Sequence, residues 1–224
     1  MKTRIKIDSS LLSFVILLTG VLYLVPRFYV GSKALDQVFD FFGMIFILKG
    51  VFFRMVARAH KKFHSQQGGE LVSTGIYKYV RNPMYLGSFF IGSGFVLLVW
   101  PWWSYPIFAA LFYLRFRNEV NKEESLLSKK FGKNYEEYCQ KTPRLFPLIQ
   151  NFEKIKTREI FRFDEAFATS EARGLWGWPL LAFTLEIFQE KLVFGFIDLK
   201  STLLIFFWAA VTFTVLFWIQ FQKS

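Results

Sequence analysis

Long apolar blocks separated by basic stretches constrain the fold of this chain more than any other feature. Of its 224 residues, 53% are hydrophobic and 21% are aromatic. A helix of roughly 20 apolar residues crosses the ~30 Å hydrocarbon core of a bilayer. The sequence therefore predicts an all-α, polytopic integral membrane protein with about six transmembrane helices. We expect these helices at residues 10–25, 36–57, 84–100, 103–118, 174–190 and 201–220.

The fifth apolar block is the least regular of the six. Glu186, Gln189 and Glu190 interrupt its end, so it either spans the bilayer or lies in the interface as a re-entrant segment. Ionisable groups at membrane depth, such as Glu186 and Lys49, are functional candidates by default. Lys49 lies near the end of its block, where a lysine side chain reaches the headgroups by snorkelling.

Lysine and arginine are distributed very unevenly between the predicted loops. With the N-terminus in the cytoplasm, 23 of the 28 basic residues lie on the cytoplasmic side and four lie on the opposite side. Cytoplasmic loops carry this excess in membrane proteins, so we expect both termini in the cytoplasm. The same flanking positions, beside anionic headgroups, account for the net charge of +11 without a nucleic-acid partner. The single cysteine, Cys139, excludes an intrachain disulfide and a cysteine-rich metal site.

Two hydrophilic stretches, 58–82 and 119–173, fall on the predicted cytoplasmic side. They flank a helical hairpin, 84–118, that turns at Pro101-Trp102-Trp103, and we expect the hairpin to bring them together into a site. Pro83 suits the first position of the hairpin's first helix. The free N–H groups at such a helix start favour an anionic group.

The second hydrophilic stretch begins as a continuation of the fourth apolar helix. Glu119 and Glu123 lie four residues apart and share one face of that helix. Two like charges on one face need a partner, either basic side chains or a cationic ligand. Arg115 and Lys122 are the candidate structural partners of Glu119.

An ordered series of residues runs through both stretches and the hairpin between them. It reads Leu71-Val72-x-x-Gly75-x-Tyr77-x-x-Val80-Arg81-Asn82-Pro83-x-Tyr85, then Glu123-Glu124-x-x-Leu127, Phe131-Gly132-x-x-Tyr135-x-x-Tyr138, Pro143 and Pro147. The series resembles the isoprenylcysteine carboxyl methyltransferases and the wider set of membrane phospholipid-type methyltransferases. The resemblance covers about a third of the chain, from Glu70 to Pro147, and residues 151–224 carry no recognised pattern.

The resemblance implies transfer of a methyl group from S-adenosyl-L-methionine to a lipophilic acceptor at the membrane surface. Carried over by position, the cofactor-binding residues are Glu70, Leu71, Val72, Tyr77, Asn82, Pro83, Met84, Tyr85 and Glu123. The residues expected at the reacting groups or the acceptor are Arg81, Glu119 and Tyr85. Carboxylates such as Glu123 suit ribose hydroxyls, and tyrosine rings suit adenine or the sulfonium.

Two positions depart from the family pattern. The histidine before the proline is Asn82 here, a substitution associated with bacterial-type members, so we expect a bacterial plasma membrane. Asparagine donates and accepts hydrogen bonds but cannot act as a base. The acceptor-contacting arginine four residues before the cofactor glutamate is Glu119 here. An acidic side chain would repel a carboxylate, so a prenylated cysteine, a phospholipid amine, a small thiol and an isoprenoid all stay open as acceptors.

Two other classes of function also stay open: a nicotinamide-dependent (NADPH) membrane reductase of the sterol-reductase type, and a non-catalytic membrane scaffold. His60 and His64 have metal-ligand spacing without a marked third ligand, so no metal is expected. We expect three parts in the chain: 1–69 with two helices, 70–150 as the methyltransferase core, and 151–224 with a surface segment at 151–170 and one or two final helices. The expected partners are the acceptor and membrane lipids, and the oligomeric state is left open.

Overall fold

The computed structural model describes residues 32–147 and 160–222, and its regular structure within them is helical throughout. The predicted all-α class is confirmed. The first predicted apolar helix, 10–25, and part of the predicted surface segment lie outside the described residues. The seven α-helices in the described residues are α2 (Lys33–His64), α3 (Pro83–Val99), α4 (Tyr105–Phe131), α5 (Lys133–Lys141), α8 (Phe163–Phe167), α9 (Gly174–Val193) and α10 (Leu199–Gln222).

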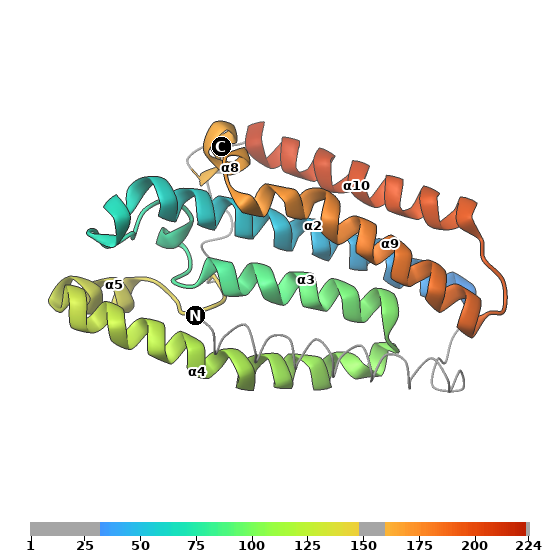
Figure 1. Cartoon of the computed structure of the whole chain (residues 1–224), viewed down its shortest axis with the longest axis horizontal. Coiled ribbons are helices and arrows are strands. Elements are labelled where there is room, and N and C mark those ends of the chain that lie inside the picture. Colours follow the sequence, from blue (N-terminus) through green and yellow to red (C-terminus); the bar gives the residue numbers. More distant parts are fainter. Residues whose placement is uncertain (1–31, 148–159, 223–224) are drawn as a thin grey trace.

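The long helices lie side by side along the longest axis of the molecule (Figure 1). Helices α2 and α3 run antiparallel and pack through paired glycines. A Cβ atom added at Gly50 would lie 2.5 Å from the carbonyl oxygen of Gly87, and Gly43 and Gly94 form a second close pair two turns away. Small residues let helix backbones approach closely where no large side chain can be accommodated. This glycine seam, Gly43, Gly50, Gly87 and Gly94, fixes α3 against α2.

The predicted hairpin is present. Helix α3 begins at Pro83, and the short 3₁₀ helix η4 (Trp102–Ser104) reverses the chain into α4. Stacked phenylalanines, including Phe89 on Phe108, join the two helices. As predicted, α4 continues past the apolar block, to Phe131, and carries its acidic residues on its second half.

Among the described helices, α10 is both long and apolar enough to cross a membrane, and α3 is apolar but has 17 residues. The other predicted spans within the described residues coincide with helices that carry charges. Helix α2 includes Asp40, Lys49 and Arg54 within its predicted block, and α9 ends with Glu186 and Glu190. Helices are therefore present at these predicted positions, but their charged residues keep them from being uniformly apolar spans.

The helices leave two differently built ends. At one end lie the last turn of α2, the start of α3, the second half of α4, and α5 (Figure 1). At the other end the start of α2 meets the end of α9 and the start of α10 (Figure 1). The first end contains the predicted site residues.

Candidate functional site

Three helices meet at Glu123. Its carboxylate accepts hydrogen bonds from Lys61 Nζ at 3.0 Å and from the Tyr85 hydroxyl at 3.4 Å. Lys61 stands in the last turn of α2, Tyr85 in the first turn of α3, and Glu123 on the extension of α4. Phe116 packs edge-on against the Tyr85 ring at 5.3 Å between centroids. The structure therefore brings together Tyr85 and Glu123, both predicted site residues, and adds Lys61.

Tyr77 forms the buried wall beside this group. It lies on the 3₁₀ helix η3 (Gly75–Lys78), which Gly75 can start because its φ is +56°. The Tyr77 hydroxyl donates to the Ala57 carbonyl at 3.3 Å, and the Tyr138 hydroxyl donates to the Tyr77 carbonyl at 2.7 Å. Burial and the negative charge of Glu123 raise the pKa of Tyr77 above its ordinary range. Tyr77 is therefore a neutral, fixed ring in the electrostatic field of Glu123.

A second network surrounds Glu124, the neighbour of Glu123. Its carboxylate pairs with Arg144 at 3.0 Å and with Arg81 at 3.5 Å. Asn82 donates from its amide to Glu124 at 3.2 Å and to the Arg144 carbonyl at 3.0 Å. Partial burial opposes the charge on Arg81, but Glu124 and Cys139 outweigh it, so the pKa of Arg81 is raised. Successive residues of a helix point about 100° apart, so Glu123 and Glu124 serve different faces.

A cavity of about 760 Å³ lies between the chain before α3 and helix α5. Its size falls in the range of small-molecule sites. Glu70 and Leu71 of the predicted cofactor set line it, together with Ser73, Lys78, Tyr79, Asn134, Glu137, Tyr138, Lys141 and Thr142. Tyr138 connects this cavity to Tyr77 through the hydrogen bond described above.

The remaining predicted residues lie apart from these groups. Val72 and Met84 pack against the hydrophobic core, and Pro83 is buried at the start of α3. Glu119 pairs with Lys122 at 3.1 Å and with Arg115 at 3.8 Å. Arg115 and Lys122, the partners expected for Glu119, are thus present, and Lys61 is an additional partner for Glu123.

The two histidines stack on each other, with ring centroids 4.1 Å apart. His60 Nε2 lies 2.9 Å from the Thr74 hydroxyl, which ties α2 to the turn before η3. Burial, and to a lesser degree the charge of His64, lower the pKa of His60 to about 4. At neutral pH His60 is therefore an uncharged structural group.

Comparison with known sequences identifies this part of the chain. The sequence model of a family described as phospholipid methyltransferase matches residues 39–134. Residues 39–134 are therefore similar to the phospholipid methyltransferase family, and we call them the phospholipid methyltransferase region. The resemblance found in the sequence is confirmed, and the match begins earlier than the motif series because it includes most of α2.

Several curated proteins are similar to the phospholipid methyltransferase region. Protein-S-isoprenylcysteine O-methyltransferase of Schizosaccharomyces pombe is 36% identical over 98 residues, which are 44% of this chain and 39% of that protein. The protein of the same name from Saccharomyces cerevisiae is 28% identical over 137 residues, 57% of each chain. Nickel-cobalt-cadmium resistance protein NccN of Alcaligenes xylosoxydans xylosoxydans is 31% identical over 88 residues, 39% of this chain and 41% of that protein. The chain thus spans about two fifths to three fifths of the length of these relatives. No solved structure matches it.

The phospholipid methyltransferase region supplies the three helices that meet at Glu123, but sequence reasoning missed two of its contacts. Lys61 belongs to a basic run at the end of α2, and nothing in the sequence distinguishes it from the neighbouring basic residues. The pairing of Arg81 with Glu124 was also missed. The signal was available, since both belong to the motif series and carry opposite charges.

Proposed function

We propose that this protein is a membrane-embedded methyltransferase that uses S-adenosyl-L-methionine and acts on a lipophilic acceptor. One observation carries the proposal: the phospholipid methyltransferase match, 39–134, contains all three helix segments that bring Lys61, Tyr85 and Glu123 together. The three residues that meet at Glu123 therefore all lie within the matched region.

The side chains that face outward support a bilayer location. Large apolar residues are exposed on the first half of α4 and along α9 and α10, an arrangement that soluble monomers avoid. They include Ile107, Leu111, Leu114, Trp176, Leu180, Phe188, Leu203, Phe207 and Trp208. We place about six spanning helices in the chain, with both termini and the Glu123 end in the cytoplasm, as the charge distribution favours. Asn82 favours a bacterial plasma membrane. We retain the division at 1–69, 70–150 and 151–224.

The residues at Glu123 fit the methyl donor. A carboxylate such as Glu123 accepts hydrogen bonds from ribose hydroxyls, and Tyr85 offers a ring and a hydroxyl beside it. Lys61 would then have to release or share Glu123. Glu70 and Leu71, on the adjoining cavity, would hold the far end of the molecule. When bound, the cofactor supplies an activated methyl carbon on a sulfonium, so the protein's contribution is alignment and exclusion of water.

The acceptor is the less defined half of the proposal. A prenylated cysteine presents a carboxylate, whereas a phospholipid amine is neutral or cationic. Glu119 lies one helical turn before Glu123 and would favour the amine. Its pairs with Arg115 and Lys122 reduce this preference, since both balance its charge. We therefore assign the acceptor class as lipophilic and place its head group between Glu119 and Arg81.

Binding of radiolabelled S-adenosyl-L-methionine to the full chain, purified in detergent, tests the proposal. We expect saturable binding by the wild type and a loss of roughly tenfold or more in Glu123→Gln, because a hydrogen bond to a charged group contributes about 1.5–3 kcal/mol. Glu136→Gln, on the exposed face of α5, is the matched control and should bind as the wild type does. Thermal melting of each variant confirms that it is folded.

Each outcome has a separate meaning. Absence of saturable binding in the wild type would overturn the methyltransferase assignment. Equal binding by the wild type and Glu123→Gln would overturn the placement of the cofactor at Glu123 and shift attention to the cavity by α5. Lipid extracts incubated with labelled cofactor and the protein would then identify the acceptor through the labelled product.

A further inference from the structure

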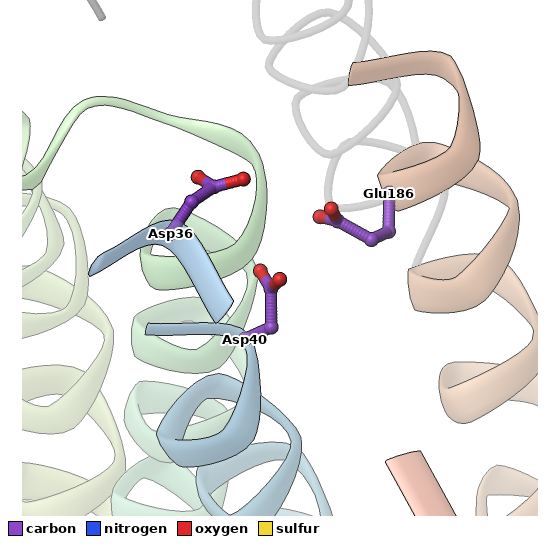
Figure 2. Close-up of side chains that lie close together, drawn as sticks. All are labelled: Asp36, Asp40 and Glu186. Carbon is purple, nitrogen blue, oxygen red and sulfur yellow. The ribbon is translucent and has the colours of Figure 1, made fainter. Parts of the chain in front are cut away.

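Three carboxylates from two helices converge at the end of the molecule opposite Glu123. Asp36 and Asp40 lie one turn apart on α2, and Glu186 points toward them from α9 (Figure 2). One oxygen of each lies within 4.8 Å of the others. Asp40 is 3% exposed and Glu186 is 1% exposed, whereas Asp36 lies at the edge of the group and is partly exposed.

The described part of the chain does not balance these charges. No ion pair joins Asp36, Asp40 or Glu186 to a basic side chain within the described residues. Lys33, the nearby cation, is engaged by Asp198 at 3.1 Å and by Glu190 at 3.5 Å. Three negative groups so close together in a buried place repel one another strongly, and burial removes the water that would otherwise stabilise them.

Several buried oxygens of this group also lack hydrogen-bond donors among the described residues when the carboxyl groups are ionised. Within residues 32–147 and 160–222, Oδ1 of Asp40 and both carboxylate oxygens of Glu186 are buried without a donor. The neutral side chain of Gln189 is a second indication that a ligand is bound at this place. Its amide nitrogen donates to Asp36 at 3.1 Å, which fixes the orientation of the amide, and its buried carbonyl oxygen is left without a donor. Buried acceptors in native proteins are rarely left in this state, and a bound metal ion is one of the standard reasons for an apparent exception.

We propose that Asp36, Asp40 and Glu186 bind a divalent cation, with the Gln189 carbonyl oxygen as a further ligand. One cation satisfies the unpaired oxygens and offsets most of the negative charge in one step. Oxygen ligands select hard cations. Two ligands on opposite sides of one ion lie up to about 5 Å apart for calcium but only about 4.2 Å apart for magnesium, since their bond lengths are about 2.3–2.6 and 2.0–2.1 Å. The separations of up to 4.8 Å lie within the span that calcium can bridge, so calcium is the ion to test first. Asp36, at the edge of the group, gives the ion a route from solvent.

The proposed ion would join parts of the chain that are far apart in sequence. Asp36 and Asp40 belong to α2, the helix that carries Lys61. Glu186 and Gln189 belong to α9, which follows the phospholipid methyltransferase region. A cation between them would fasten α9 to α2. The inference does not rest on the proposed methyltransferase activity, because neither the ligands nor the test involves the cofactor.

Calcium binding to the full chain in detergent, after treatment with EDTA, tests the site. We expect equilibrium dialysis with ⁴⁵Ca²⁺ to give one bound ion per chain, and the melting temperature to rise as calcium is added. Glu186→Gln and Asp40→Asn should each weaken binding by at least about tenfold, the loss that even indirect partners of a metal produce. Asp164→Asn, an exposed carboxylate on α8, should behave as the wild type does.

The melting temperature without calcium separates loss of the site from loss of the fold. Removing one charge from an unbalanced group should leave calcium-free Glu186→Gln at least as stable as the calcium-free wild type. A wild type that binds no stoichiometric calcium, magnesium or manganese would overturn the proposal and show that the carboxyl groups carry protons instead. Undiminished calcium binding in both variants would overturn it as well.

Discussion

The carboxylates at the two ends of this molecule have opposite surroundings. At the Glu123 end the partly exposed Glu123 pairs with Lys61, and its neighbour Glu124 pairs with two arginines. At the far end Asp40 and Glu186 have no such partner within the described residues. A ligand at the first end must therefore compete with existing ion pairs. A ligand at the second end supplies a charge that the described chain lacks.

The largest expected effect comes from forcing apart the helices that connect the two ends. Gly50→Val places side-chain atoms against the Gly87 carbonyl, because even a Cβ atom there would lie 2.5 Å from it. We expect a loss of about 3 kcal/mol of stability, the upper part of the range for overpacking, and loss of cofactor binding as Tyr85 moves away from Lys61. Thermal melting and labelled-cofactor binding measure the two effects.

Gly177→Val is the control for the glycine seam. Gly177 lies on the exposed face of α9, and nothing would contact an added Cβ atom. This variant should melt close to the wild type. Similar losses in both variants would mean that valine in a helix, rather than the closeness of α2 and α3, accounts for the effect.

Acid should weaken the Glu123 end through His60, whose pKa is lowered to about 4 by burial. The unfolded chain binds a proton at this residue near pH 6.5, before the folded chain does. The stability gained from a neutral His60 is therefore complete above about pH 6.5 and is lost as the pH falls through about 4, by up to roughly 3 kcal/mol. Unfolding in detergent across this range should show a steeper pH dependence for the wild type than for His60→Asn. An unchanged slope in His60→Asn would contradict the assignment of this pH dependence to His60. The control variant His64→Asn should retain most of the pH dependence.

Replacing a glutamate by glutamine should change the stability of the protein differently at the two ends. Glu124→Gln leaves Arg81 and Arg144 without their shared carboxylate, and we expect a loss of about 2 kcal/mol, typical of hydrogen bonds to charged groups. Glu186→Gln in calcium-free protein should cause no loss, since it removes a repelling charge. Melting temperatures of both variants in EDTA make the comparison. Destabilisation of similar size at both ends would show that the carboxylates of the far end are already balanced.

The sequence predicted the Glu123 end better than the far end for a physical reason. Pro83 and the aromatic turn after Pro101 are local signals, and they are enough to place Tyr85 and the α4 extension on the same side of the molecule. A hairpin with a short turn leaves its two helices few alternative registers. The contact between Tyr85 and Glu123 therefore follows from local structure together with the motif spacing.

The far end depends on a packing register that no local signal specifies. Asp40 and Glu186 stand 146 positions apart, and α9 could have packed on α2 with Glu186 turned outward. The sequence shows each acidic residue as an interruption of an apolar block. It does not show which of these acidic residues contact one another in the fold. The partners of Glu123 and Glu124 on α4 could not be predicted either. The sequence shows that the two side chains lie on different faces of the helix, but not which residues pack against each face.

The smallest expected effect concerns Lys122, whose pair with Glu119 is exposed and three residues apart on one helix. Such pairs contribute about 0.3–0.5 kcal/mol, so Lys122→Gln should hardly change melting. It removes one of the positive charges that balance Glu119, however, and leaves Glu123 in place. If Glu119 contacts the acceptor, the variant should lower KM for a cationic phospholipid amine and raise it for a carboxylate acceptor, with unchanged affinity for S-adenosyl-L-methionine. Lys129→Gln, an exposed lysine further along α4, should change neither value. Equal KM values for Lys122→Gln and the wild type with both kinds of acceptor would restrict Glu119 to its structural pairs.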